Sequence, residues 1–158
     1  MRLTFTKGTG KYDHLHIDRD GLPLETIQCP KQGIIPHDMI HYAVESVVPH
    51  RGFLSLLRDG KAASFSTQGD EVADAIERLV ETLQAEMWSG RVAATDIIAM
   101  YEHGCKASGH AVAPVSGENV EEIRARIDHL TAAWANVPDK GKLTVMFEGP
   151  SPQSAQSA

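Results

Sequence analysis

The chain has 158 residues, of which 42% are hydrophobic and 23% charged, and its formal net charge is −6. This length suits one domain, and the composition is that of a globular protein that can bury a core. No apolar run approaches the roughly 20 residues of a transmembrane helix. No cluster of Lys and Arg is present of the kind that binds phosphates or anionic lipids. We therefore expect no nucleic-acid partner and no membrane partner.

The N-terminal segment MRLTFTKGTG lacks the apolar stretch of a signal peptide, which favours a cytoplasmic protein. The two cysteines, Cys29 and Cys105, lie far apart in the sequence and form no C-x-x-C pair. In a reducing compartment both are expected to be free thiols, so the sequence predicts no disulfide framework.

Alternating apolar residues predict three short strands at the start of the chain. They cover residues 2–6, 12–18 and 24–29, and Gly-rich and Asp-Gly turns separate them, as in an antiparallel meander. Residues 142–148 alternate in the same way. They predict a fourth strand, which is expected to return to the N-terminal sheet.

Between the third and fourth strands the apolar residues recur at helical spacing. The chain is expected to form helices over residues 36–48, 52–60, 70–88, 95–104 and 118–137. Thr95 and Ser116 stand where N-caps are expected.

Strands and helices are segregated along the chain rather than alternating, which favours the α+β class. We expect an antiparallel sheet, made of the N-terminal three-stranded meander plus the C-terminal strand, packed against four to five helices. Residues 1–149 are predicted to form this single domain. Residues 150–158 are small, polar and rich in Pro and Ser, and they predict a disordered tail.

The helix at 118–137 carries a narrow apolar seam with alternating spacings of three and four residues. Such a seam packs against one neighbouring helix, either within the fold or in a homodimer. It supports one interpretation of the protein, as a non-catalytic interaction module or homo-oligomer. On the outer face, Glu122 with Arg126 and Arg124 with Asp128 have the i, i+4 spacing of ion pairs. The seam consists of Val120, Ile123, Ile127, Leu130, Trp134 and Val137.

The stretch PHDMIHYAVE, residues 36–45, supports a second interpretation. At roughly 100° per residue, His37, His41 and Glu45 form one line along the border of the apolar face. A border of this kind is partly dry, and there a metal can bind or a pKa can shift. The competing interpretation is structural: the two histidines then only form hydrogen bonds at the edge of the core.

The string HDMIH, residues 37–41, resembles the H-E-x-x-H motif of zinc-binding helices, with Asp38 in place of the glutamate. The resemblance implies that His37 and His41 bind one metal ion. Because the Asp38 side chain is one methylene shorter, its carboxylate would stand back from metal-bound water, so metal binding is a better expectation than proteolysis.

A zinc site requires at least three protein ligands. Glu45 is one candidate for the third. His14 and His16 are two more, since they share one face of the predicted strand at 12–18. We therefore expect zinc or another divalent metal at His37 and His41, with help from Glu45, His14 or His16. The pattern leaves open whether the protein is an enzyme.

Overall fold

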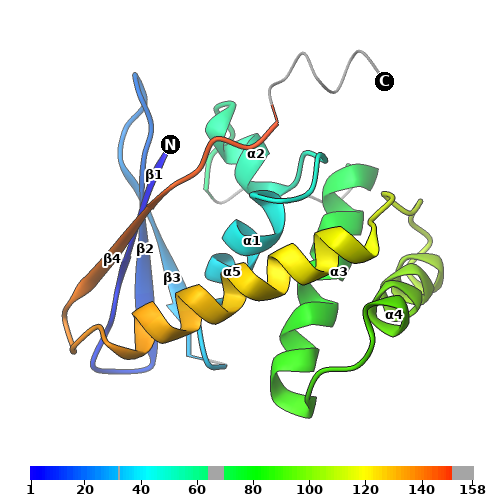
Figure 1. Cartoon of the computed structure of the whole chain (residues 1–158). Helices are drawn as coiled ribbons and strands as arrows, with labels where there is room; N and C mark the ends of the chain where they lie inside the picture. Colours follow the sequence, from blue (N-terminus) through cyan, green and yellow to red (C-terminus); the bar gives the residue numbers. More distant parts are fainter. Residues whose placement is uncertain (32, 64–69, 151–158) are drawn as a thin grey trace.

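A four-stranded antiparallel sheet forms one layer of the molecule, and the five helices of the described chain lie on one side of it (Figure 1). The computed structural model describes residues 1–31, 33–63 and 70–150. The α+β class predicted from the sequence is confirmed. The predicted disordered tail lies outside the described residues, except for Pro150.

The sheet has the strand order β3-β2-β1-β4. The N-terminal meander supplies three strands, and the C-terminal strand pairs antiparallel with β1, with Thr4 opposite Thr144. The return of the last strand to the first sheet is therefore confirmed. The strands are β1 (Arg2–Thr6), β2 (Tyr12–Asp18), β3 (Glu25–Pro30) and β4 (Lys142–Met146).

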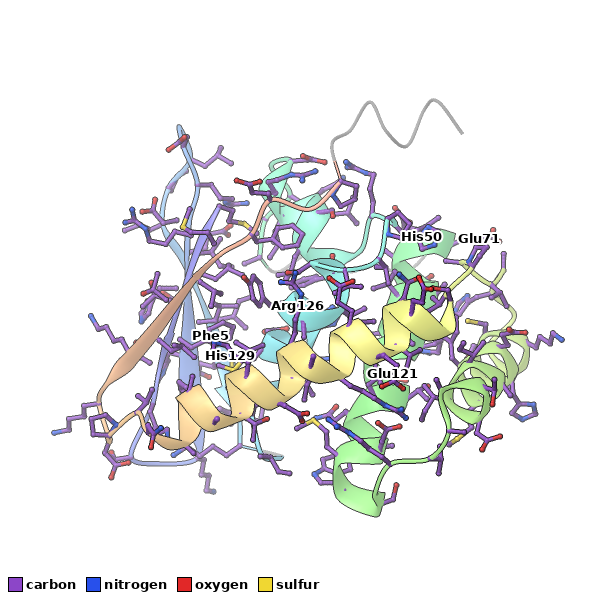
Figure 2. All side chains as sticks on the ribbon, viewed as in Figure 1. Phe5, His50, Glu71, Glu121, Arg126 and His129 are labelled. Atoms are coloured by element: carbon purple, nitrogen blue, oxygen red, sulfur yellow. The ribbon has the colours of Figure 1, made fainter. Side chains whose placement is uncertain are left out.

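Alternation along β1 and β2 separates the two faces of the sheet. Leu3, Phe5, Leu15 and Ile17 are fully buried against the helices, and Figure 2 shows Phe5 on that side of the sheet. The residues between them, including His14 and His16, project from the opposite face.

The helices cover one face of the sheet, with α1 at the centre of the helical layer (Figure 1). Helix α1 contacts α2, α3 and α5, while α4 packs against α3 and α5. Of the helices described, none combines the length and the apolar character needed to cross a membrane. Their bounds are α1 (His37–Glu45), α2 (Phe53–Arg58), α3 (Glu71–Ser89), α4 (Ala94–Ala107) and α5 (Gly117–Ala135).

One of the two predicted N-caps is confirmed. Ser116 forms a reciprocal capping box with Asn119. Asp70, which was not predicted as a cap, also caps α3, since its side chain accepts a hydrogen bond from the amide of Ala73. The prediction for Thr95 was wrong, because α4 already begins at Ala94 and no side chain caps it.

Helix α1 is shorter than predicted and ends at Glu45 rather than at residue 48. The amides of Val47 and Val48 both bond to the carbonyl of Val44, which tightens the chain into a turn before Pro49. Since Pro disfavours helical geometry in the preceding residue, the helix stops before it reaches Val48.

The seam of α5 is buried within the chain itself. Ile123, Ile127, Leu130 and Trp134 are all at most 5% exposed and belong to the main core. The predicted burial of the seam is confirmed, and the internal packing satisfies it without a second chain.

Leu130→Ala is expected to lower the free energy of unfolding by about 2–5 kcal/mol, because it removes a buried side chain and leaves a cavity. Urea unfolding measures this change. His129→Ala, one residue away on the exposed face of α5, is the matched control and should change stability by less than about 0.5 kcal/mol. If both variants lowered the free energy of unfolding by less than about 0.5 kcal/mol, Leu130 would not be packed in the core.

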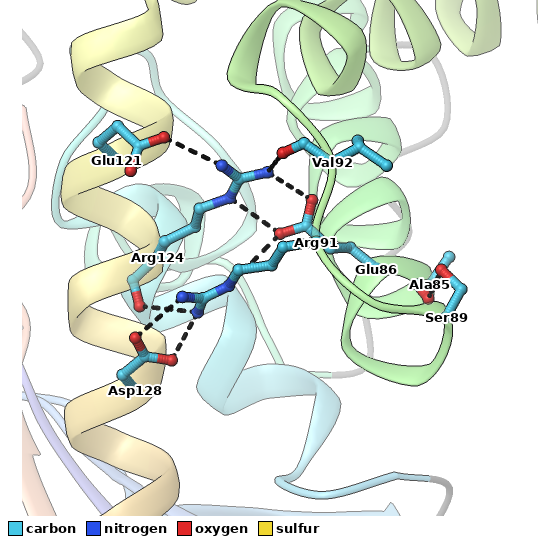
Figure 3. A network of polar contacts seen from close by, with 8 residues as sticks. All are labelled: Ala85, Glu86, Ser89, Arg91, Val92, Glu121, Arg124 and Asp128. Carbon is cyan, nitrogen blue, oxygen red and sulfur yellow. Dashed lines mark hydrogen bonds and ion pairs between the residues drawn. The ribbon is translucent and has the colours of Figure 1, made fainter.

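A buried ion pair fixes α5 to α3 (Figure 3). The guanidinium of Arg124 donates from Nε and Nη2 to the two carboxylate oxygens of Glu86, at 2.9 and 2.7 Å. Nη2 also donates to the carbonyl of Val92, and Nη1 donates to Glu121. This bidentate geometry is the strong form of an arginine–carboxylate pair.

The predicted pair between Arg124 and Asp128 was wrong, because Arg124 turns inward toward α3. Asp128 pairs instead with Arg91, which follows α3 in the sequence (Figure 3). The other predicted pair on this helix, Glu122 with Arg126, is present at 3.6 Å.

Candidate metal centre

Two histidines of α1 and one glutamate of α3 meet between these helices. His37 and His41 lie one helical turn apart, with their ring centroids 5.0 Å from each other. The Glu77 carboxylate bridges the two rings: Oε1 lies 3.0 Å from Nε2 of His37, and Oε2 lies 2.6 Å from Nε2 of His41. The same nitrogen of both rings is therefore directed at one carboxylate.

The other nitrogen of each ring has an acceptor of its own. Nδ1 of His37 lies 2.9 Å from Oε1 of Gln84, and Nδ1 of His41 lies 2.9 Å from Oε2 of Glu45. Each Nδ1 can donate to its acceptor, and in a neutral ring that keeps this donor the lone pair lies on Nε2. Metal-binding histidines are commonly oriented by such an acceptor on the second nitrogen.

Glu45 is fully buried, and its carboxylate is held by backbone as well as by His41. It accepts hydrogen bonds from the amide of Leu54, at 3.0 and 3.1 Å, and from the amide of Ser55, at 3.3 Å. These two amides lie in the first turn of α2, where backbone N–H groups have no partner within the helix. Glu45 therefore links the orientation of His41 to the start of α2.

Gly52 makes room for this carboxylate. A Cβ at position 52 would lie 2.6 Å from Cδ of Glu45 and 2.9 Å from Cγ2 of Ile76. The φ of Gly52 is −107°, which other residues adopt freely, so the requirement for glycine is one of space and not of backbone conformation.

The ion pairs shift the pKa values of His37, His41 and Glu77. Burial by itself lowers the pKa of His41, but the hydrogen bonds to Glu45 and Glu77 outweigh it and raise that pKa to about 10. For His37, burial is likewise outweighed by the hydrogen bond to Glu77, and the pKa is raised. Burial would raise the pKa of Glu77, yet its hydrogen bonds with the two histidines hold that pKa well below its usual range. Without a metal, His41 is therefore an imidazolium between two carboxylates at neutral pH.

Stability should accordingly fall as pH rises above neutrality in the presence of a chelator. A raised His41 pKa means that the folded state keeps a proton that the unfolded chain releases near its ordinary value of 6.5. The stabilisation is complete below that pH and is lost progressively toward about pH 10. The free energy of unfolding should decrease by at most about 1.4 kcal/mol per pH unit for this one proton.

Urea unfolding between about pH 7 and 8.5 measures this slope, in a range below the ordinary pKa of cysteine. His41→Gln is the control, and it should flatten the curve whatever its absolute stability. Parallel curves for the two proteins would contradict the shifted pKa.

The cluster has the composition of a metal site. One ligand atom each from His37, His41 and Glu77 can be chosen so that all three lie within 4.8 Å of one another. Bonds from zinc to nitrogen or carboxylate oxygen are about 2.0–2.1 Å long, so two ligand atoms on a tetrahedral ion are roughly 3.3 Å apart. The Glu77 carboxylate oxygens lie 2.6 Å from Nε2 of His41 and 3.0 Å from Nε2 of His37. Each of these distances would widen by less than about 1 Å if the three residues bound an ion.

The structure brings only part of the predicted ligand set together. His37 and His41 point at a common carboxylate, but His14 and His16 lie on the opposite face of the sheet, where His16 contacts Thr26 at 3.1 Å. Glu45 contacts His41 on the side away from Glu77, so it orients this ring instead of completing the set of three.

Glu77 and Gln84 were missed in the sequence because they lie on α3, about 40 residues after the histidines. Their spacing of seven residues places them on one side of that helix, next to its apolar stripe. Charged residues at such positions are common on surface helices, so the pattern alone could not single them out.

A surface pocket of about 360 Å³ adjoins the cluster at His37. Cys29 lines it, but its thiol is not a nucleophile at neutral pH, because burial and the neighbouring Asp38 and Asp13 carboxylates raise its pKa to about 12. The remaining lining residues are Gln28, Pro30, Asp38, Glu81 and Gln84.

Comparison of the chain with protein-family models, curated proteins and solved structures finds no match. The function therefore has to be inferred from the geometry of this cluster.

Proposed function

We propose that the protein binds a divalent metal ion such as zinc through His37, His41 and Glu77. The observation that carries the proposal is the convergence of both Nε2 atoms on the Glu77 carboxylate while both Nδ1 atoms are held by acceptors. Two imidazoles and one carboxylate are a ligand set of zinc enzymes, in which the remaining position holds water or substrate.

The ion has to compete with a proton. A metal binds neutral imidazole, whereas the two flanking carboxylates favour the protonated form of His41. Metal affinity should therefore keep increasing with pH above neutrality, beyond the range of about 6 to 7 in which an unperturbed histidine loses its proton. Binding is best measured at about pH 8 for this reason.

Tag-free protein should copurify with a divalent metal or bind zinc in calorimetric titration. An ion that binds only the folded state, at a free concentration of about 100 times its Kd, raises the free energy of unfolding by about 2.7 kcal/mol. For a chain of this size, this corresponds to an increase in Tm of roughly 5–10 °C. Chelator should reverse this increase. Mutating a residue that only hydrogen-bonds to a metal ligand lowers metal affinity about 10–100-fold. Glu77→Gln changes a proposed ligand itself, so it should lower the affinity by at least that factor.

The matched control removes two histidines elsewhere. His37→Ala/His41→Ala should abolish binding, while His103→Ala/His129→Ala, at exposed positions of α4 and α5, should retain it. If no metal copurifies and neither zinc nor chelator moves the wild-type Tm, the cluster is an ion-pair network that only joins α1 to α3.

The alternative is an interaction module or homo-oligomer built on α5. Since the seam of this helix is buried internally, such a role would have to use its outer face. A groove of about 520 Å³ between α5 and β4 lies there, with Ala125, Leu143 and Val145 in its lining. Arg126 and His129 project from α5 beside it (Figure 2). Light scattering of the full chain tests this alternative, because a monomer at high concentration would exclude the homo-oligomer.

Both cysteines are free and buried. Together with the sequence, this supports our proposal that the protein acts in a reducing compartment such as the cytoplasm.

A further inference from the structure

The metal-ligand cluster is open on one side only. The His41 and Glu45 side chains are 2% and 0% exposed, whereas those of His37 and Glu77 are 33% and 24% exposed. A fourth ligand can therefore reach an ion held by the three residues from the side of His37 and Glu77. The surface pocket next to this side has His37 in its lining, but not His41 or Glu77.

Within the described residues, only three metal-ligand groups converge in this cluster. Structural zinc sites use four protein ligands, whereas sites with three keep a position for water or an exchangeable ligand. Cys29 lines the pocket but is not among the groups that converge on this point, so the three ligands leave a position open.

The charges around the cluster and pocket are mainly negative. Glu45 and Glu77 lie in the cluster, and Asp38 and Glu81 line the pocket. No Lys or Arg belongs to the pocket lining. Apart from His37 and His41, which a metal would bind in their neutral form, Arg78 is the one cation among the described residues that pairs with these four carboxylates, and it contacts Glu81 at 2.9 Å. These four carboxylates carry more negative charge than a divalent ion and Arg78 together carry positive charge. An anionic ligand that approaches the ion from the pocket would therefore be repelled.

We infer that the bound metal keeps one exchangeable position on the His37 and Glu77 side, and that this position takes small neutral nitrogen donors in preference to anions. The ligand class is thus an imidazole or an uncharged amine, and carboxylates and phosphates are disfavoured. This inference rests on the proposed metal site.

Cobalt(II) provides the test, because its visible absorption reports the number and kind of ligands. The full-length protein is loaded with cobalt at about pH 8 and titrated separately with imidazole and with azide. Imidazole should change the spectrum in a saturable manner, and azide should bind at least about 10-fold more weakly. Asp38→Asn and Glu81→Gln should each strengthen azide binding by roughly 3–10-fold.

Glu122→Gln is the matched control, since it removes one exposed carboxylate from α5 and should leave azide binding unchanged. A cobalt spectrum that neither ligand alters would overturn the exchangeable position. Azide binding as tight as imidazole binding would overturn the preference. Both results leave the metal site itself in place, whereas a protein that acquires no cobalt spectrum overturns the proposed function and this inference with it.

Discussion

Glu45→Ala is expected to lower the free energy of unfolding by about 3–5 kcal/mol, the largest effect of any single substitution at the cluster. The variant removes a fully buried carboxylate that pairs with His41 and accepts the amides of Leu54 and Ser55. An imidazolium and two backbone donors are then left without this acceptor in the protein interior.

Urea unfolding in the presence of chelator measures this loss without a contribution from metal. Glu122→Ala is the control, because Glu122 also forms an i, i+4 pair, with Arg126, but both side chains are largely exposed. Surface pairs of this kind contribute about 0.3–0.5 kcal/mol. If the two variants lost equal stability, Glu45 would not hold α1 to α2 as described.

Gly52→Ala tests the same contact without removing any polar group. Alanine adopts the backbone conformation of Gly52, so the cost comes from the overlap of its Cβ with Glu45 and Ile76. A loss of about 1–3 kcal/mol is expected from such overpacking. A neutral result would mean that Glu45 can move aside.

Glu86→Ala is expected to cost about 3–5 kcal/mol, because it leaves the buried guanidinium of Arg124 without its bidentate partner. The side chains of Glu86 and Arg124 are 4% and 7% exposed, so water cannot replace the lost carboxylate. The substitution acts on the contact between α3 and α5 and leaves the metal ligands in place.

The control for this prediction is the other carboxylate on the same arginine. Glu121 also pairs with Arg124, but its side chain is 64% exposed, so Glu121→Ala should cost less than about 1 kcal/mol. Urea unfolding of the two variants compares a buried and an exposed partner of one cation. Comparable losses would show that burial does not decide the strength of this pair.

The sequence by itself determined the elements whose signals are local. Period-two alternation identified all four strands, and the capping residue Ser116 marked the start of α5. The seam of α5 was also visible, because any helix with one apolar stripe must bury it. The line of His37 and His41 followed from helical geometry alone.

Only the tertiary structure decided what surrounds those histidines. Helix α2 covers Glu45 and α3 covers His41, so residues expected at a partly dry border are fully buried. The third ligand, Glu77, comes from α3, and the strand histidines His14 and His16 face away. Contacts between separate elements depend on how each helix is rotated and placed against its neighbours, and residue spacing within a single element carries no information about this.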